Sequence, residues 1–315
     1  MEVLGKSLTI FIVTALLAMN FKVPSQEDAV QAIGNLEGLA QTSQRTLDPG
    51  QDFVLMDQPK DGDWLAEHKE DGQTFAKFVN ANPIRPDSDR NKLYLQPLGR
   101  FRDGRSPAQD LLKAYAESFF AMEVIRRPAL AIENTKFTHR KNPYSGNRQI
   151  LTRDILILLK KNLPSDAFCM LAITMEDLYP DPSWNFVFGQ ASMRERVGVF
   201  SFARYDPSFY RQNGTNGYQK LLLHRSCKVL AHETGHMFNL AHCIFFRCVM
   251  NGSNHLQESD TRPQFLCPVC LRKLQFSIGF DFLERYRKLL LFYQAVGFED
   301  EAGWVSGRLK WILDK

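Results

Sequence analysis

The sequence predicts an α/β layered domain, and three patterns indicate this class. Short apolar strands alternate with amphipathic helices from about Lys92 onward. Residues 167–173 form a continuous apolar run between turn residues, which is typical of a strand that is buried on both faces of a sheet. A long helix that begins near Lys220 follows the last predicted strand. With 315 residues, of which 44% are hydrophobic, the chain is long enough to bury such a core.

Residues 1–22 are an apolar N-terminal segment with two interpretations. Lys6 precedes an apolar run from Leu8 to Met19 that is too short to span a bilayer. The run resembles the apolar part of a secretory signal, whereas Glu2 and the poor cleavage sequence at residues 18–20 do not fit one. The alternative is an amphipathic or buried N-terminal helix.

Residues 23–90 form a second region, which has weak periodicity. They are rich in Gln, Asp, Gly and Pro, and residues 41–52 are expected to be an exposed loop. Five apolar side chains of this region are expected to pack on the main body: Trp64, Leu65, Phe75, Phe78 and Val79. The sequence indicates no function for this part of the chain.

The main domain is predicted to span residues 91–295, and its first helix carries a start signal. Ser106 is expected as the N-cap, with Pro107 in the first turn and Gln109 closing a capping box. Apolar residues then follow at helical spacing up to Pro128. They are Leu111, Leu112, Tyr115, Phe119, Met122 and Ile125.

Further elements follow in an alternating order. Strands are expected at residues 93–95, 129–132, 167–173, 186–188 and 197–203, and a second helix at 154–161. A C-terminal helix is expected over residues 296–315. The apolar residues of the last part of the chain are best explained by core packing. They are Phe282, Leu283, Tyr286, Leu289, Leu290, Tyr293, Trp304, Leu309, Trp311 and Ile312.

The predicted long helix carries a histidine motif that points to a metal site. The string H-E-T-G-H-M-F-N-L-A-H-C begins at His232 and contains Glu233, His236 and His242. On a helix, His232 and His236 share one face and can reach one zinc ion at about 2.0–2.1 Å. His242 lies too far along the chain to share that face, so the helix must stop and the chain must turn. Asn239 is the residue best suited to that turn, because Asn often replaces Gly in the left-handed conformation.

These residue types at this spacing can perform hydrolysis. Three neutral imidazoles leave the +2 charge of zinc undiminished, so that a bound water titrates near pH 7. Glu233 is placed beside the ion, where it can take a proton from this water and pass it to a leaving amine. His255 and Glu258 have two interpretations, as lining of the cleft or as part of a solvated loop, and the solvated loop is expected. His224 is expected to be a residue of the helix surface.

Four of the six cysteines form a second metal-ligand pattern. Cys243 and Cys248 are followed, after an 18-residue bridge, by Cys267 and Cys270, and this spacing fits a closed tetrahedral zinc site. Cys169 and Cys227 are expected to be small buried residues. Such a set of thiols favours a reducing, intracellular compartment (cytoplasm or nucleus) over secretion.

The extended motif resembles the archaemetzincins, a family of the metzincin clan. The pattern H-E-x-x-H-x-x-(G/N)-x-x-H, followed at once by Cys243 and then by Met250 and C-P-V-C, carries this resemblance. Supporting strings lie at residues 173–180, 184–191, 199–205 and 252–256. The resemblance implies a metzincin-like zincin: a mixed, twisted sheet with an active-site helix, a four-cysteine zinc module over residues 243–270, and C-terminal helices.

The resemblance also implies roles for individual residues. It makes His232, His236 and His242 the ligands of a catalytic zinc, Glu233 the general base, and Met250 the apolar Met-turn residue below the histidines. Cys243, Cys248, Cys267 and Cys270 would hold a second, structural zinc. Residues 199–204 would be the edge strand against which an extended peptide pairs. Asn239 departs from the glycine that is usual in the family.

The function predicted from these patterns is that of a zinc-dependent metallopeptidase, a hydrolase with two zinc ions per chain. A peptide or protein is the expected substrate, and a monomer is expected. Nucleic acid is not an expected partner, because 39 basic and 35 acidic residues give a net charge of only +4. A membrane is not expected either. The alternative is a catalytically weak, zinc-stabilised binding or scaffold protein, which is motivated by Asn239 and by the size of the four-cysteine zinc module.

Overall fold

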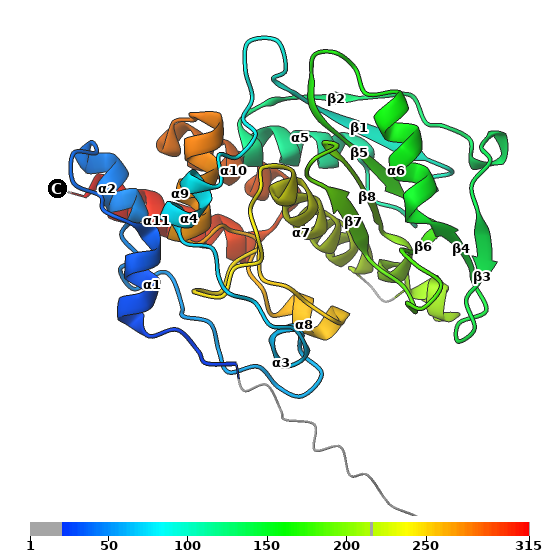
Figure 1. The fold of residues 1–315 in the computed structure, drawn as a ribbon, viewed down its shortest axis with the longest axis horizontal. Helices are drawn as coiled ribbons and strands as arrows, with labels where there is room; N and C mark the ends of the chain where they lie inside the picture. Colours follow the sequence, from blue (N-terminus) through cyan, green and yellow to red (C-terminus); the bar gives the residue numbers. More distant parts are fainter. Residues whose placement is uncertain (1–20, 215–216, 315) are drawn as a thin grey trace, which may run out of the picture.

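A five-stranded mixed sheet forms the centre of the fold in the computed structural model, which describes residues 21–214 and 217–314 (Figure 1). The strand order is β2-β1-β5-β8-β7. The first four strands are parallel, and β7 pairs antiparallel with β8. Their bounds are β1 Lys92–Leu98, β2 Glu123–Arg126, β5 Ala167–Thr174, β7 Gly189–Ser192 and β8 Val197–Ser201. The predicted α/β class, with a mixed sheet and a long helix after the last predicted strand, is confirmed.

Helices cover both faces of this sheet, which explains why nearly every residue of its central strands is buried. Helix α6 (Thr152–Lys161) lies on one face, and α5 (Gln109–Phe120) and α7 (Tyr218–Met237) lie on the other (Figure 1). Every residue of β5 is buried. Alternate residues of a strand point to opposite faces, so Leu171 and Met170 belong to two different hydrophobic clusters.

A second sheet of three short strands flanks the first, in the order β3-β4-β6. These strands are His139–Lys141, Arg148–Leu151 and Asp177–Tyr179. Short 3₁₀ segments occur at Ile132–Asn134, Ala203–Tyr205 and Pro207–Tyr210.

The C-terminal and N-terminal helices pack together beside the sheet. Helices α9 (Pro268–Ile278), α10 (Phe282–Val296) and α11 (Glu299–Leu313) follow the short α8 (Leu256–Asp260). From residue 21 onward, four N-terminal helices precede the sheet: α1 Gln26–Ile33, α2 Gln41–Leu47, α3 Trp64–Glu67 and α4 Phe75–Asn80. Helices α1, α2 and α4 contact α9, and α2 also contacts α11. The predicted C-terminal helix is confirmed. The expected core packing is confirmed except at Trp311, which is 42% exposed and lies beside the Arg45 guanidinium.

The expected loop over residues 41–52 is wrong. Its first half is helix α2, and Thr46 and Leu47 at the end of that helix are buried. The polar sequence of residues 41–47 gives no local signal for this helix. Its buried residues contact α9 and α11, which are distant in the sequence. The expected packing of this region is confirmed, since Leu65 and Phe78 are buried and Trp64, Phe75 and Val79 contact the core or its aromatic residues.

The predicted start and end of the first main helix are also wrong. Helix α5 begins at Gln109 after Ala108, and the Ser106 hydroxyl donates to Arg102 O instead of capping the helix. The helix ends at Phe120, because Ala121 adopts a left-handed conformation with a φ of 50°. Residues 123–126, including Ile125, are strand β2 and pair in parallel with β1.

Two of the predicted strands are not strands in the structure, and a third predicted strand does not lie at the edge of the sheet. Residues 129–132 contribute one isolated bridge, from Leu130 to Leu98, and residues 186–188 likewise contribute a single bridge at Val187. Strand β7 begins only at Gly189. The expectation that residues 199–204 form the edge strand is wrong, because β8 lies between β5 and β7 and the edge belongs to β7.

The interpretation of residues 1–22 as a signal or a helix falls almost entirely outside the described residues, which begin at Phe21. Within the described ranges, no helix is both long enough and apolar enough to cross a membrane.

Candidate metal centres and active-site cleft

Helix α7 places the first two histidines of the motif. His232 and His236 lie one turn apart near its C-terminal end, as their spacing predicts. Buried residues such as Cys227 and Leu230 fix the helix against the sheet and α5. The next reversal of the chain occurs at Asn239, which has a φ of 63°. The predicted left-handed turn at Asn239 is therefore confirmed.

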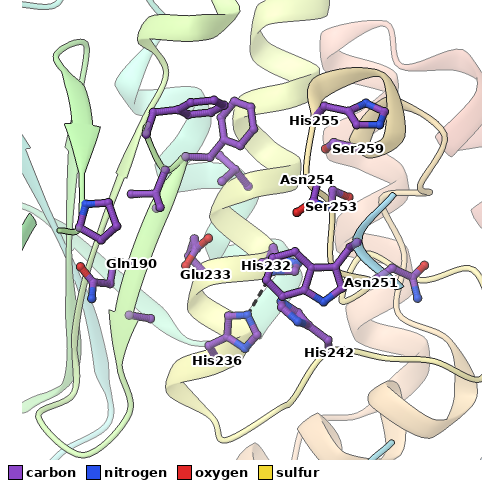
Figure 2. Close-up of a pocket in the computed structure, with 18 of the residues that line it drawn as sticks. Gln190, His232, Glu233, His236, His242, Asn251, Ser253, Asn254, His255 and Ser259 are labelled. Atoms are coloured by element: carbon purple, nitrogen blue, oxygen red, sulfur yellow. Dashed lines mark hydrogen bonds between the residues drawn. The ribbon is translucent and has the colours of Figure 1, made fainter. Parts of the chain in front are cut away.

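The three imidazole rings of His232, His236 and His242 converge at the foot of a cleft (Figure 2). In each ring Nδ1 lies within hydrogen-bonding distance of an oxygen. The partners are Val249 O at 2.8 Å, Leu240 O at 2.7 Å and the Glu70 carboxylate at 2.8 Å, in that order. Since these oxygens accept a hydrogen bond from Nδ1–H, each Nε2 keeps its lone pair and is free to bind a metal.

This geometry fits a metal ion. The Nε2 atoms of His232 and His236 face each other at 3.1 Å, and ligand atoms of all three rings lie within 4.8 Å of one another. Two lone pairs at that distance repel unless a cation lies between them. Tetrahedral zinc with Zn–N distances of about 2.0–2.1 Å separates its nitrogen ligands by about 3.3 Å. The three rings therefore match the ligand set of such an ion.

The electrostatic environment also favours neutral, metal-binding imidazoles. Burial lowers the pKa of His236 to about 4. Burial and, secondarily, the neighbouring His236 and His242 hold the pKa of His232 well below its usual value. Metal binding needs the deprotonated ring, so these two ligands require no proton release at neutral pH.

Glu233 lies on the side of helix α7 that faces strand β7. A Cβ atom at Gly189 would come within 2.8 Å of the Glu233 carboxyl carbon, so the glycine leaves room for this carboxyl group. The side chain is nearly buried and lines the same cleft as the three imidazoles (Figure 2). Burial raises the pKa of Glu233 to about 8, and a dication bound nearby would lower it again.

Met250 packs directly below helix α7 between the histidines. A Cβ atom at Gly235 would lie only 2.5 Å from the Met250 sulfur, and Met250 is fully buried. Cys243 N donates to Met250 O at 2.8 Å, which ties the segment after the third histidine to this residue. Met250 thus occupies the position expected for an apolar floor, and its role as a Met-turn remains a prediction.

The four predicted cysteine ligands form a second, buried cluster. The sulfur atoms of Cys243, Cys248, Cys267 and Cys270 lie within 4.8 Å of one another, and the Cys243 and Cys267 sulfurs are 3.5 Å apart. Zinc with Zn–S distances of about 2.3 Å would separate its sulfur ligands by about 3.8 Å. The backbone N–H groups of Met250 and Cys267 point at the Cys248 sulfur, as they would at a thiolate. Cys169 and Cys227 lie buried elsewhere in the core, as predicted.

The three imidazoles and Glu233 line a cleft of about 980 Å³. One wall is β7 and the apolar segment before it, and the other is the segment after Met250 (Figure 2). The apolar wall contains Trp184, Phe186, Val187 and Phe188, and the polar wall contains Asn251, Ser253, Asn254 and His255.

Several known proteins are similar in sequence to this chain over most of its length. Residues 143–276 match the model of Peptidase family M54. The chain is 38% identical over 308 residues to Archaemetzincin-2 of Macaca fascicularis, which covers 88% of this chain and 83% of that relative. It is 42% identical over 255 residues to Archaemetzincin-2 of Mus musculus, covering 72% of this chain and 71% of the relative.

The chain belongs to the archaemetzincins. Among solved structures, the archaemetzincin from Methanopyrus kandleri is 30% identical, with a TM-score of 0.45 over 62% of this chain and 99% of that chain. The resemblance inferred from the histidine and cysteine motif is thus confirmed at the level of the family, which is a peptidase family.

Some side chains of this archaemetzincin differ from their predicted surroundings. Glu258 is buried, pairs with Arg262 at 2.9 Å and accepts the backbone N–H of Trp64, so the expectation of a solvated residue is wrong for it. His255 lies at the rim of the cleft, with Nε2 3.3 Å from Asp63. His224 is half-buried, and its Nε2 lies 2.6 Å from the Glu301 carboxylate.

Sequence reasoning missed Glu70, the acidic partner of His242. Glu70 lies 172 positions before His242 and outside residues 143–276, and no motif surrounds it. The nearest signal was the expectation that the neighbouring Trp64 and Leu65 pack on the main body.

Proposed function

We propose that this archaemetzincin is a zinc metallopeptidase that hydrolyses peptide bonds at the three-histidine site. The carrying observation is the convergence of three imidazole rings beside a buried carboxyl group at the foot of one cleft. A zinc ion held by His232, His236 and His242 would supply a Lewis acid that polarises a carbonyl and acidifies water.

The residues of the chain would perform the proton transfers. Glu233 takes a proton from the attacking water onto a carboxylate oxygen and later delivers it to the leaving amine nitrogen. Burial makes the protonated carboxyl easier to form, so Glu233 can hold the proton between these two steps. The oxygen partners at the three Nδ1 atoms keep the rings oriented throughout.

The substrate would bind as an extended peptide along β7. This strand is the edge of the sheet and forms one wall of the cleft, so its free side can pair with a substrate backbone. The apolar side chains at residues 184–188 offer contacts for hydrophobic substrate residues. We propose that the four-cysteine cluster holds a second zinc ion with a structural role.

The test is digestion of a peptide library by the zinc-loaded protein and by Glu233→Gln. We expect turnover to fall by about 10²–10⁴-fold in the variant, the range for loss of a general acid–base group, with two zinc ions retained. Glu299→Gln changes an exposed glutamate on α11 and is the matched control. Equal turnover by wild type and Glu233→Gln would disprove the proposed role of this residue.

The scaffold alternative is less well supported. One of its two motives was Asn239, and this residue adopts a left-handed turn between His236 and His242, which lie close together. The other motive, the size of the cysteine module, is equally compatible with a peptidase.

A further inference from the structure

The loop that carries His242 is held by a segment from the N-terminal region. Gln73 contacts this loop twice: its side-chain nitrogen donates to Asn239 O at 3.0 Å, and its side-chain oxygen accepts from Ala241 N at 3.1 Å. Lys273 Nζ donates to the same oxygen at 3.1 Å, which fixes the orientation of the amide. Two backbone groups of this loop, Asn239 O and Ala241 N, thus have their hydrogen-bond partner in a residue far away in the sequence.

Trp64 of the same segment packs against His242 itself. The two rings meet edge to face, with centroids 4.9 Å apart. Trp64 is fixed at both ends, because its backbone N–H donates to the buried Glu258 and its indole N–H donates to Glu70 at 2.9 Å. A Cβ atom at Gly252 would lie 2.5 Å from the Trp64 ring, so the glycine makes room for the indole.

Glu70 completes the arrangement with a carboxylate oxygen 2.8 Å from His242 Nδ1. The same oxygen accepts the Trp64 indole N–H, which leaves it little freedom to move. His232 and His236 use backbone carbonyls at the equivalent position. His242 therefore differs from the other two rings, because its Nδ1 partner is a charged side chain on a separate part of the chain.

We propose that Glu70 is a positioning residue for the catalytic centre. Its carboxylate fixes the tautomer and the ring orientation of His242, while Gln73 holds the loop that presents this histidine and Trp64 packs against its ring. A carboxylate behind a ligating imidazole also makes the ring a stronger donor. The proposal rests on the proposed function, since it concerns how the third ligand of that metal site is held.

The test measures zinc affinity at the histidine site by competition with a chelator, in the full-length protein whose cysteine site stays loaded. We expect Glu70→Ala to weaken zinc binding by about 10–100-fold, as for other outer partners of metal ligands. Glu70→Gln keeps an acceptor for the His242 Nδ1–H but lacks the charge, so we expect a smaller loss. Asp71→Ala removes an exposed carboxylate one residue away and should bind zinc like wild type.

A second readout is the visible absorption of cobalt placed in the histidine site. A displaced His242 should change the ligand-field bands in Glu70→Ala, with partial return in Glu70→Gln and none of the change in Asp71→Ala. Wild-type zinc affinity and cobalt spectra in both Glu70 variants would overturn this proposal without contradicting the proposed peptidase function. Failure of the wild type to bind metal through His232, His236 and His242 would instead overturn the proposed function.

Discussion

At the scale of single residues, Asn239 shows how the chain departs from the usual glycine and still closes the turn. Its φ of 63° is left-handed, and its side-chain oxygen accepts from Ile84 N at 3.3 Å. Non-glycine residues pay about 1–2 kcal/mol in this conformation, and Asn less than most.

We therefore expect Asn239→Ala to lower the free energy of unfolding by about 1–2 kcal/mol. Ala tolerates the left-handed conformation less well than Asn, and its side chain cannot accept the hydrogen bond from Ile84 N. Asn239→Gly should unfold at the wild-type denaturant concentration or slightly above it. Denaturant titrations of the zinc-loaded proteins measure both changes. An alanine variant as stable as wild type would show that the turn is not strained.

A second residue-scale prediction concerns Lys228, which lies one turn before His232 and is almost fully buried. Its Nζ donates to Ser259 O at 2.9 Å. Burial lowers its pKa to about 8, against weaker opposing effects of Asp260 and Glu301 and with Arg225 and Arg262 acting in the same direction as burial. In the unfolded chain the pKa of this lysine should be about 10.4. Between about pH 8 and about pH 10.4 the unfolded state therefore binds more protons than the folded state.

It follows that this lysine makes the protein more stable as pH rises from about 8 toward about 10.4. Replacing it by Met should remove that rise. Relative to Lys228→Met, wild type should gain up to about 3 kcal/mol across this window. The measurement is the free energy of unfolding at about pH 7.5 and about pH 9.5, with Lys220→Met as the control for loss of a charge on the same helix. Parallel pH profiles of wild type and Lys228→Met would contradict the prediction.

At the scale of elements, the cysteine cluster organises the segment between helices α7 and α9. Cys267 is the N-cap of α9 and Cys270 lies in its first turn, while Cys243 follows His242 directly. The segment between them contains little regular structure, and zinc binding would supply part of its folding free energy.

We expect Cys267→Ser to lose one zinc ion and to lower the thermal unfolding temperature by several degrees, because a tetrahedral site with three thiolates binds zinc more weakly. Metal analysis and thermal unfolding measure these effects. Cys227→Ala removes a buried thiol outside the cluster and should retain both ions. A Cys267→Ser protein with two zinc ions and unchanged stability would exclude a structural zinc at the cysteines.

The elements that the sequence predicted correctly are those whose signal is local. Strand β5 is a continuous apolar run, and helix α6 has a regular apolar stripe, so both were found. The strands at residues 123–126 and 189–192 were not predicted, because they are defined by pairing with β1 and β8 and carry no local pattern of their own. The histidine and cysteine clusters were predictable because metal coordination imposes short, fixed spacings on the chain.

At the scale of the whole molecule, the N-terminal region packs into the same body as helix α7, which carries the candidate metal ligands. Its residues contact the His242 loop through Gln73 and Glu70, and contact the C-terminal helices through α1, α2 and α4. These contacts join residues that are far apart in the sequence, and periodicity within one segment carries no information about them. This explains why Glu70 and helix α2 escaped the sequence prediction.

Arg308 is the residue that best tests this integration. Its side chain on α11 is fully buried, donates to the Asp52 carboxylate at 2.9 Å and donates to Thr46 O at 3.0 Å. Trp304, one turn earlier, stacks on Phe265 of the cysteine-bearing segment with ring centroids 3.8 Å apart. Helix α11 therefore links the N-terminal region to the candidate metal centres.

We expect Arg308→Ala to lower the free energy of unfolding by about 3 kcal/mol, since it leaves buried acceptors without their donor. Because the parts form one body, tryptophan fluorescence, far-ultraviolet circular dichroism and zinc release should report a single, coincident transition in wild type and variant. Arg287→Ala, an exposed arginine on α10, should change stability by less than about 0.5 kcal/mol. An early transition in which the N-terminal region detaches while zinc stays bound would show that this region folds as a separate unit.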